Sequence, residues 1–136
     1  MDVTVVLAQF DTEEKQMTLA NAGQHAYPLL IRNGTVQPVK AKGLALGMIP
    51  SIVYKSTVMH LESGDLLLMM TDGITEPRNA EGVMYEESGR LNQVLLSIPA
   101  EMPIKEVVDT IINDVEAYTA DEEQDDDITL VAVRVS

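Results

Sequence analysis

The sequence predicts an α+β domain with a mainly antiparallel sheet and a helix pair. Two observations lead to this fold class. Short β-rich segments joined by tight turns fill the first part of the chain, and hairpins of this kind imply antiparallel pairing. Two amphipathic helical segments then follow at 88–98 and 103–115, before a last β-rich segment at 128–135. Strands, then a helix pair, then one more strand are typical of a layered α+β domain.

Two hairpins are predicted at the start of the chain. Residues 3–20 contain two β-rich runs around a polar turn at 11–15. Residues 27–39 contain two more around the pair Asn33-Gly34. Asn-Gly tolerates the positive φ angles that a two-residue type I′ turn requires, so the second hairpin has a specific turn signal.

Two further strands are predicted before the helices. Residues 52–61 are β-rich, and residues 63–65 (Ser-Gly-Asp) turn the chain. The continuous apolar run 66–71 then indicates a strand that is buried on both faces.

The helix pair has a start signal for each helix. Ser88 can cap a short helix that extends to Ile98, and Pro103 suits the first turn of a longer one. The acidic segment 121–127 is predicted to be a loop. The apolar positions of the longer helix recur at helical spacing and predict a stripe that docks on a sheet: Ile104, Val107, Val108, Ile111, Ile112 and Val115.

Composition narrows the classes of function. The 136 residues fit a single domain, without internal repeats or an interdomain linker. A net charge of −13 disfavours a nucleic-acid partner on electrostatic grounds and favours metal ions or a basic protein surface. The chain has no cysteine, and its longest apolar run, 66–70, is too short for membrane insertion. We therefore expect a cytoplasmic protein.

Two carboxylates lie where buried strands end or begin. Asp72 follows the strand 66–71, and Asp126 precedes the strand 128–135. If the two strands are antiparallel neighbours, both carboxylates lie at one edge of the sheet, where they can hold a hard cation such as Mg²⁺ or Mn²⁺. Gly73 would let the chain turn sharply after Asp72. The alternative is that Asp-Gly marks only a turn and the acidic run only a solvated loop.

Neighbouring residues have candidate supporting roles. A hydroxyl of Thr71 or Thr75 could donate to the free oxygen of Asp72, and Glu76 could orient a metal-bound water. Arg78, close after these residues, is a candidate for binding phosphate through its guanidinium.

Five segments in order resemble the metal-dependent protein phosphatase (PPM) family, in particular its SpoIIE-like serine/threonine phosphatases. They are MTLANAG at 17–23, PLLIRNG at 28–34, GLALGM at 43–48, LESGDLLLMMTDGITEPRN at 61–79 and DDITLVAVRV at 126–135. The resemblance implies an αββα sandwich with two Mn²⁺ or Mg²⁺ ions at a sheet edge, which activate water to hydrolyse phosphoserine or phosphothreonine.

The resemblance also implies roles for particular residues. In that family the aspartate of the TDG motif and the first aspartate of the DDIT motif are metal ligands, which correspond here to Asp72 and Asp126. Gly73, Asp127 and Thr129 belong to the same motifs and are candidates for supporting the ligands. The substrate would be a phosphorylated signalling protein, such as an anti-sigma-factor antagonist.

The sequence departs from the family pattern in one respect. Family members carry a DVSGHG-like motif, with the aspartate that bridges both ions, upstream of the segments matched here, and residues 1–60 contain only Asp2 and Asp11. We therefore expect residues 1–136 to be a single phosphatase domain that lacks its N-terminal part, with weak activity or none on its own. Exposed apolar surface should then favour a dimer or larger assembly.

A second class of function stays open at this point. The chain could instead be a non-catalytic pseudophosphatase or interaction module that binds partners and one metal ion. A simple acidic Ca²⁺ binder is disfavoured, because the sequence lacks the spacing of an EF-hand loop.

Overall fold

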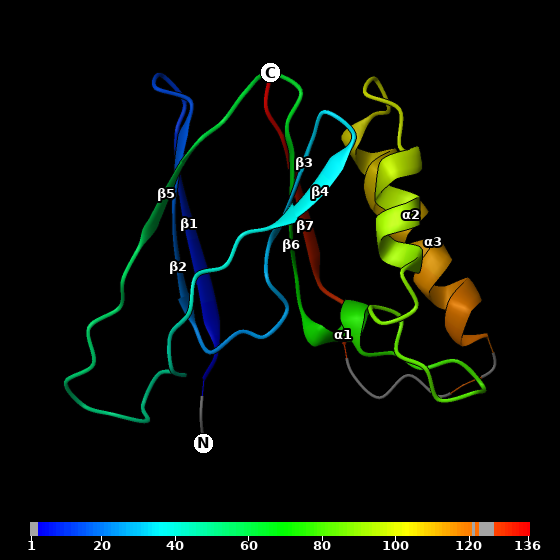
Figure 1. Ribbon diagram of the computed structural model, residues 1–136, viewed down its shortest axis with the longest axis horizontal. Helices are drawn as coiled ribbons and strands as arrows, with labels where there is room; N and C mark the ends of the chain where they lie inside the picture. The colour runs from blue at the N-terminus through cyan, green and yellow to red at the C-terminus, as the bar shows by residue number, and fades with distance from the viewer. Residues whose placement is uncertain (1–2, 121, 123–126) are drawn as a thin grey trace.

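The computed structural model describes residues 3–120, 122 and 127–136 (Figure 1). It confirms the predicted α+β class, with antiparallel sheets and few helices. The elements in chain order are β1 (Val5–Asp11), β2 (Gln16–Ala22), β3 (Leu29–Arg32), β4 (Thr35–Pro38), β5 (Thr57–His60), β6 (Leu66–Met70), α1 (Asp72–Thr75), α2 (Arg90–Ser97), α3 (Ile104–Thr119) and β7 (Leu130–Arg134).

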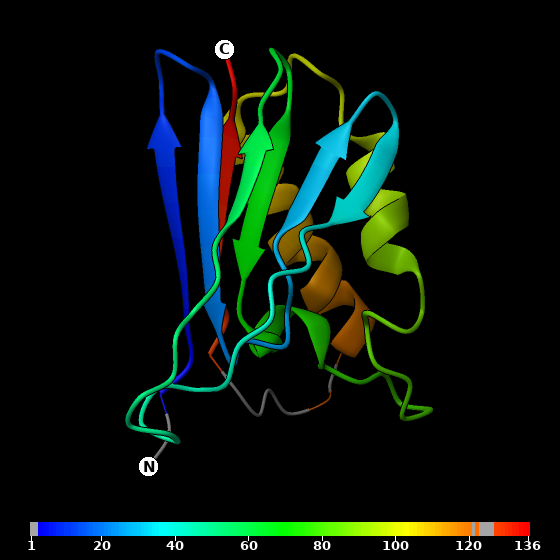
Figure 2. The ribbon, with the colours of Figure 1, turned by 60° about the vertical axis from the view of Figure 1, so that its left-hand side comes forward.

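Three layers make up the fold. A three-stranded sheet, in the order β1-β2-β5, faces a four-stranded sheet in the order β4-β3-β6-β7. Every strand pair in both sheets is antiparallel. Figure 1 shows α2 and α3 on the outer face of the four-stranded sheet, and Figure 2 shows them behind its strands. No helix lies over the outer face of the three-stranded sheet within the described residues.

Both predicted hairpins are confirmed. β1 pairs with β2, and β3 pairs with β4 around Asn33 and Gly34, whose φ angles are 50° and 73°. These angles are those of a type I′ turn. The strand predicted over 52–61 is too long, because only its last part pairs with β2, from Thr57 opposite Leu19 to His60 opposite Gln16.

The strand β6 takes part in two hydrophobic cores. Leu67 belongs to the core between the sheets, together with Met17 and Leu19 of β2. Leu66 and Leu68 point the other way, into the core beneath α2 and α3. All three leucines are at most 4% exposed. The prediction that this strand is buried on both faces is therefore confirmed, and burial of each leucine contributes about 1.5–3 kcal/mol.

Both predicted helices are present, but their bounds differ from the prediction, and Ile104 of the predicted stripe is 38% exposed. The helix α2 begins at Arg90, after Gly89 in the left-handed conformation (φ 79°), so Ser88 is not its N-cap. The Ser88 hydroxyl still accepts a hydrogen bond from the Arg90 main-chain N–H (3.2 Å). The long helix α3 begins at Ile104, so Pro103 is its N-cap residue and does not stand in its first turn, and the helix extends to Thr119. None of the helices in the described part of the chain has the length and apolar composition needed to cross a membrane.

A buried ion pair stabilises the start of β6, at the opposite end of the strand from Asp72. Arg32 donates to both carboxylate oxygens of Asp65, at 2.9 and 2.6 Å, and Asp65 is 2% exposed. Burial alone would raise the pKa of Asp65, but the hydrogen bonds from Arg32 and from the Glu62 main-chain N–H outweigh it and lower the pKa. The charge of Asp65 is therefore compensated without a metal ion.

Candidate functional site

Asp72 stands directly after the buried strand β6. The strand ends at Met70, Thr71 follows in extended conformation, and Asp72 begins the short helix α1. Its Oδ1 atom is buried and has no hydrogen-bond partner among the described residues. A buried carboxylate oxygen without a partner is costly, because it has lost its hydration without replacement. This oxygen is thus available to a ligand from outside the described residues.

The strand that follows the second acidic segment starts at the same edge of the sheet. β6 and β7 are antiparallel neighbours, and Met70 lies opposite Leu130. Beyond these residues, the Thr71 N–H donates to the Thr129 carbonyl (3.1 Å), and the Thr129 N–H donates to the Thr71 hydroxyl oxygen (3.2 Å). The register therefore carries the residues just before Thr129 alongside Asp72.

The close approach of α1 to the segment before β7 requires glycine at position 73. An added Cβ on Gly73 would lie 2.0 Å from the Asp127 carbonyl oxygen and 3.2 Å from the Ile128 Cα. Both neighbours are main-chain atoms, which a side-chain rotation cannot move away. Gly73 does not have a positive φ angle. The turn from β6 into α1 therefore does not use the left-handed freedom of glycine, and the absence of a Cβ at Gly73 instead lets two chain segments touch.

None of the other predicted supporting residues in the described part of the chain forms a side-chain hydrogen bond to Asp72 Oδ1. The Thr71 hydroxyl donates to the Asp127 carbonyl (3.4 Å) instead of to Asp72, so its predicted contact is not formed. Thr75 is buried in α1 and makes no side-chain hydrogen bond to Asp72. Thr129 contributes its main chain, and Asp127 is exposed. Asp126, the second predicted ligand, lies outside the described residues.

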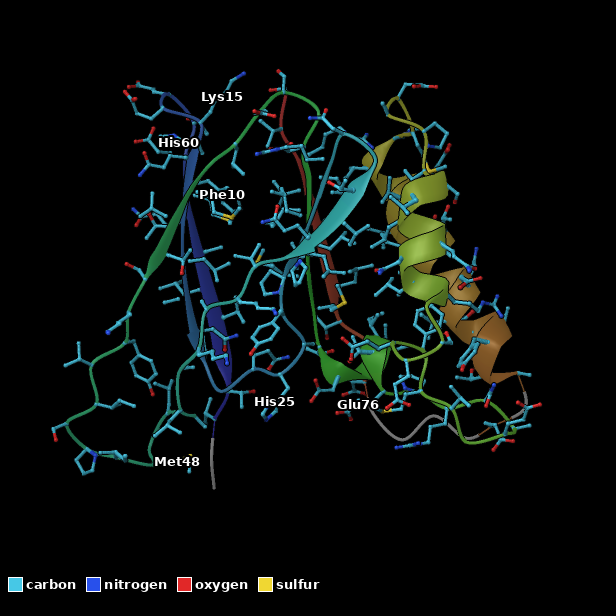
Figure 3. The ribbon with its side chains drawn as sticks, in the orientation of Figure 1. Phe10, Lys15, His25, Met48, His60 and Glu76 are labelled. Atoms are coloured by element: carbon cyan, nitrogen blue, oxygen red, sulfur yellow. The ribbon has the colours of Figure 1, made fainter. Side chains whose placement is uncertain are left out.

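A cleft of about 720 Å³ opens beside Asp72. Its lining comes from the strand ends at Asp72 and Ile128, from residues 76–84, here called the cleft loop, and from the last turns of α3. Figure 3 shows Glu76 next to α1 at this end of the sandwich. Arg78 is the single basic residue among the described lining residues. Glu76 and Arg78, the residues predicted to orient water and to bind phosphate, thus line the same cleft as Asp72.

The donor chemistry at the cleft fits a hard divalent cation. Mg²⁺ and Mn²⁺ take oxygen ligands, commonly one or two carboxylates together with water. The unpartnered oxygen of Asp72 satisfies that requirement, and Glu76 and Glu116 add carboxylates to the lining. Within the described ranges, no group of three or more His, Cys, Asp or Glu side chains is close enough together to hold an ion unaided.

The sequence did not reveal two parts of the site. The helix α1 is only four residues long, too short for a periodic pattern. The cleft loop depends on Asn79, whose side chain accepts the main-chain N–H groups of Glu81 and Val83, both at 3.0 Å. An asparagine shortly before Gly82 is a recognisable turn signal, and it could have indicated this loop.

Comparison with known proteins gives consistent matches. The model of the family described as Stage II sporulation protein E (SpoIIE) matches residues 1–136. The phosphoserine phosphatase RsbU of Bacillus subtilis is 28% identical over 136 residues, which cover 98% of this chain and 39% of RsbU.

Solved structures agree with the sequence matches. The PP2C phosphatase domain of the cell fate determinant SpoIIE from Bacillus subtilis, solved with a fragment of its regulatory domain, has a TM-score of 0.78 at 27% identity. That alignment covers 96% of this chain and 38% of the other. The manganese-presoaked phosphatase domain of SpoIIE has a TM-score of 0.75 at 24% identity, with 97% and 56% covered. The chain thus spans less than two thirds of each of these relatives.

Proposed function

The chain belongs to the SpoIIE family of PPM-type, metal-dependent protein phosphatases, and from this membership we propose that it serves in phosphoprotein dephosphorylation. The reaction is hydrolysis of phosphoserine or phosphothreonine on a signalling protein in the cytoplasm, such as an anti-sigma-factor antagonist. The relative RsbU is named a phosphoserine phosphatase, which supports this substrate class. The observation that carries the proposal is the buried Oδ1 of Asp72, a residue that lines the cleft, which has no hydrogen-bond partner in the described part of the chain.

Asp72 and Asp126 are the proposed ligands of a Mn²⁺ or Mg²⁺ ion. Asp126 directly precedes Asp127 in the sequence, and the Asp127 carbonyl lies against Gly73. The two proposed ligands therefore come from chain segments that touch. The relative that was soaked with manganese supports the choice of metal. A divalent ion in such a site lowers the pKa of water and neutralises charge on the phosphoryl oxygens. Gly73 contributes by keeping the two segments in contact.

Arg78 and Glu76 are the proposed substrate-facing residues of the cleft. The Arg78 guanidinium donates to the Gly82 carbonyl at 2.6 Å through Nη1, which fixes its position and leaves its other N–H groups for phosphate oxygens. Glu76 is exposed in the same cleft and can accept a proton or a hydrogen bond from water. In the hydrolysis, the oxygen of water bonds to phosphorus, the ester P–O bond breaks, and inorganic phosphate and the serine or threonine hydroxyl are released.

The experiment that tests this function is phosphate release from a phosphoserine peptide. We expect slow, Mn²⁺-dependent release by this chain, because the bridging aspartate of a two-ion site is missing from residues 1–136. Asp72→Asn should remove the release, whereas Asp109→Asn, an exposed carboxylate on α3, should leave it unchanged. Activity that survives in Asp72→Asn would contradict the proposal, and rapid turnover would contradict the expected weakness.

We also propose that the chain associates with a second copy of itself. Paired residues on the outer face of the three-stranded sheet include Val5, Leu7 and Val58, which are 38%, 66% and 54% exposed. An apolar sheet face beside the open edge of β1 favours pairing with another chain. The same surface supports the alternative function of an interaction module.

Sedimentation equilibrium tests the self-association. We expect a dimer or larger species at tens of micromolar, and Leu7→Lys should shift the protein to the monomer because it places a charge on the apolar face. Leu96→Lys is the matched control, since Leu96 is 52% exposed on α2, away from this face. A wild-type protein that sediments as a monomer would rule out the association.

A further inference from the structure

A cluster of four polar and aromatic side chains joins the segment after the cleft loop to α3. These residues, Tyr85, Arg90, Asp114 and Tyr118, are here called the tyrosine clamp. We propose that the tyrosine clamp is a positioning device that holds the cleft loop against α3 and thereby sets how tightly the cleft binds its phosphorylated substrate. The substrate part of this inference rests on the proposed function.

Asp114 is the centre of the clamp. Its carboxylate accepts from the Tyr85 hydroxyl and from Arg90 Nη2, both at 2.6 Å. Burial alone would raise the pKa of Asp114, but the hydrogen bonds from Arg90 and Tyr85 outweigh burial and lower it. The pKa of Tyr85 is raised, mainly by burial and to a smaller extent by its hydrogen bond to the charged Asp114. Asp114 is therefore charged and Tyr85 protonated at neutral pH, as both hydrogen bonds require.

Tyr118 connects this centre to the cleft loop. Its hydroxyl donates to the Val83 carbonyl at 2.8 Å, and its ring meets the Tyr85 ring edge-on at 5.3 Å between centroids. The Arg90 guanidinium lies 5.4 Å from the centroid of the Tyr118 ring, within the range of a cation–π contact. Tyr85 is 0% and Tyr118 8% exposed, so both rings are held by packing as well.

The cleft loop is braced by hydrogen bonds that share partners, so these bonds should open and close together. The Asn79 N–H donates to the Val83 carbonyl (3.1 Å), and the Gly82 N–H donates to the Asn79 carbonyl (2.9 Å). At the base of the loop, the Tyr85 N–H donates to the Pro77 carbonyl (2.8 Å). A change at the clamp should therefore shift the whole loop, including Arg78, whose guanidinium is bonded to Gly82.

The clamp lies behind the two walls of the cleft. One wall is the cleft loop, and the other includes Val115, Glu116 and Thr119 of α3. In α3, Asp114 directly precedes the wall residues Val115 and Glu116, and Tyr118 directly precedes Thr119. Tyr85 directly follows the cleft loop. The separation of the walls therefore depends on the clamp. None of its four residues lines the cleft, which makes them positioning residues and not catalytic ones.

The test uses Tyr118→Phe, which removes one hydroxyl and keeps the ring. The first readout is hydrogen exchange of the main-chain amides of residues 79–86, followed by mass spectrometry or NMR. We expect exchange to rise roughly fivefold there, the effect of losing one neutral hydrogen bond, with no change in the β6–β7 pair. Tyr54→Phe is the matched control, because the Tyr54 hydroxyl donates to the Leu44 carbonyl (2.7 Å) away from the cleft.

The second readout separates positioning from mere stability. The KM for Mn²⁺-dependent hydrolysis of a phosphoserine peptide should rise roughly fivefold in Tyr118→Phe, with kcat unchanged. Unchanged exchange in the loop would overturn the clamp, and faster exchange with unchanged KM would overturn its effect on substrate binding. If wild-type protein hydrolyses no phosphoserine peptide, the proposed function fails together with the substrate part, and the exchange experiment still decides whether the clamp holds the loop.

Discussion

Gly73→Ala is expected to destabilise the protein by about 3 kcal/mol, the upper end of what an overpacked methyl group costs. The new Cβ would lie 2.0 Å from the Asp127 carbonyl oxygen, so the segment before β7 would have to move away from α1. Because that segment carries the second proposed ligand, Asp126, the affinity for Mn²⁺ should fall as well. Urea denaturation and a Mn²⁺ titration measure the two effects.

Gly34→Ala provides the control for this substitution. Gly34 has a φ of 73° and open space around its Cβ position, so alanine there meets backbone strain alone, of about 1–2 kcal/mol. We expect Gly34→Ala to keep its Mn²⁺ affinity. Wild-type stability in Gly73→Ala would mean that the two segments do not pack as described.

The sequence predicted the parts of the fold that local signals specify. The type I′ turn at Asn33-Gly34 needs only the preference of those two residues for positive φ, and the structure confirms it. The start of β5 was misplaced, because its pairing with β2 begins only at Thr57 opposite Leu19 although β2 itself extends to Ala22. Where an edge strand leaves its partner is not specified by the β-rich composition of residues 52–56. The start of α2 was misplaced for a similar reason, since the Ser88 hydroxyl also donates to the Tyr85 carbonyl (2.6 Å) in the preceding segment.

The site was predictable only where it follows from strand order. Asp72 could be placed at a sheet edge because an apolar strand precedes it, and the antiparallel pairing of β6 with β7 is confirmed. The role of Gly73 could not be predicted, because its close neighbours are 54 and 55 positions away in sequence. The tyrosine clamp likewise joins residues that are distant along the chain, such as Tyr85 and Asp114. Contacts of this kind depend on the register of packed elements, which periodicity does not specify.

Asp72→Asn is expected to have the largest effect on metal binding. The substitution keeps the size of the side chain and removes its charge, so the fold should persist while the ion loses a ligand. The Mn²⁺ affinity should fall by more than about 100-fold, since loss of a group that merely supports a ligand already costs about 10- to 100-fold. Thermal unfolding in EDTA checks that the variant stays folded.

Calorimetric titration of Mn²⁺ into the wild-type protein, Asp72→Asn, Asp126→Asn and Asp109→Asn tests the central claim most directly. That claim is that Asp72 and Asp126 hold one ion together at the edge of the four-stranded sheet. We predict that the wild type and Asp109→Asn bind Mn²⁺ alike and that each of the other two variants loses binding. Wild-type affinity in either Asp72→Asn or Asp126→Asn would contradict the shared site.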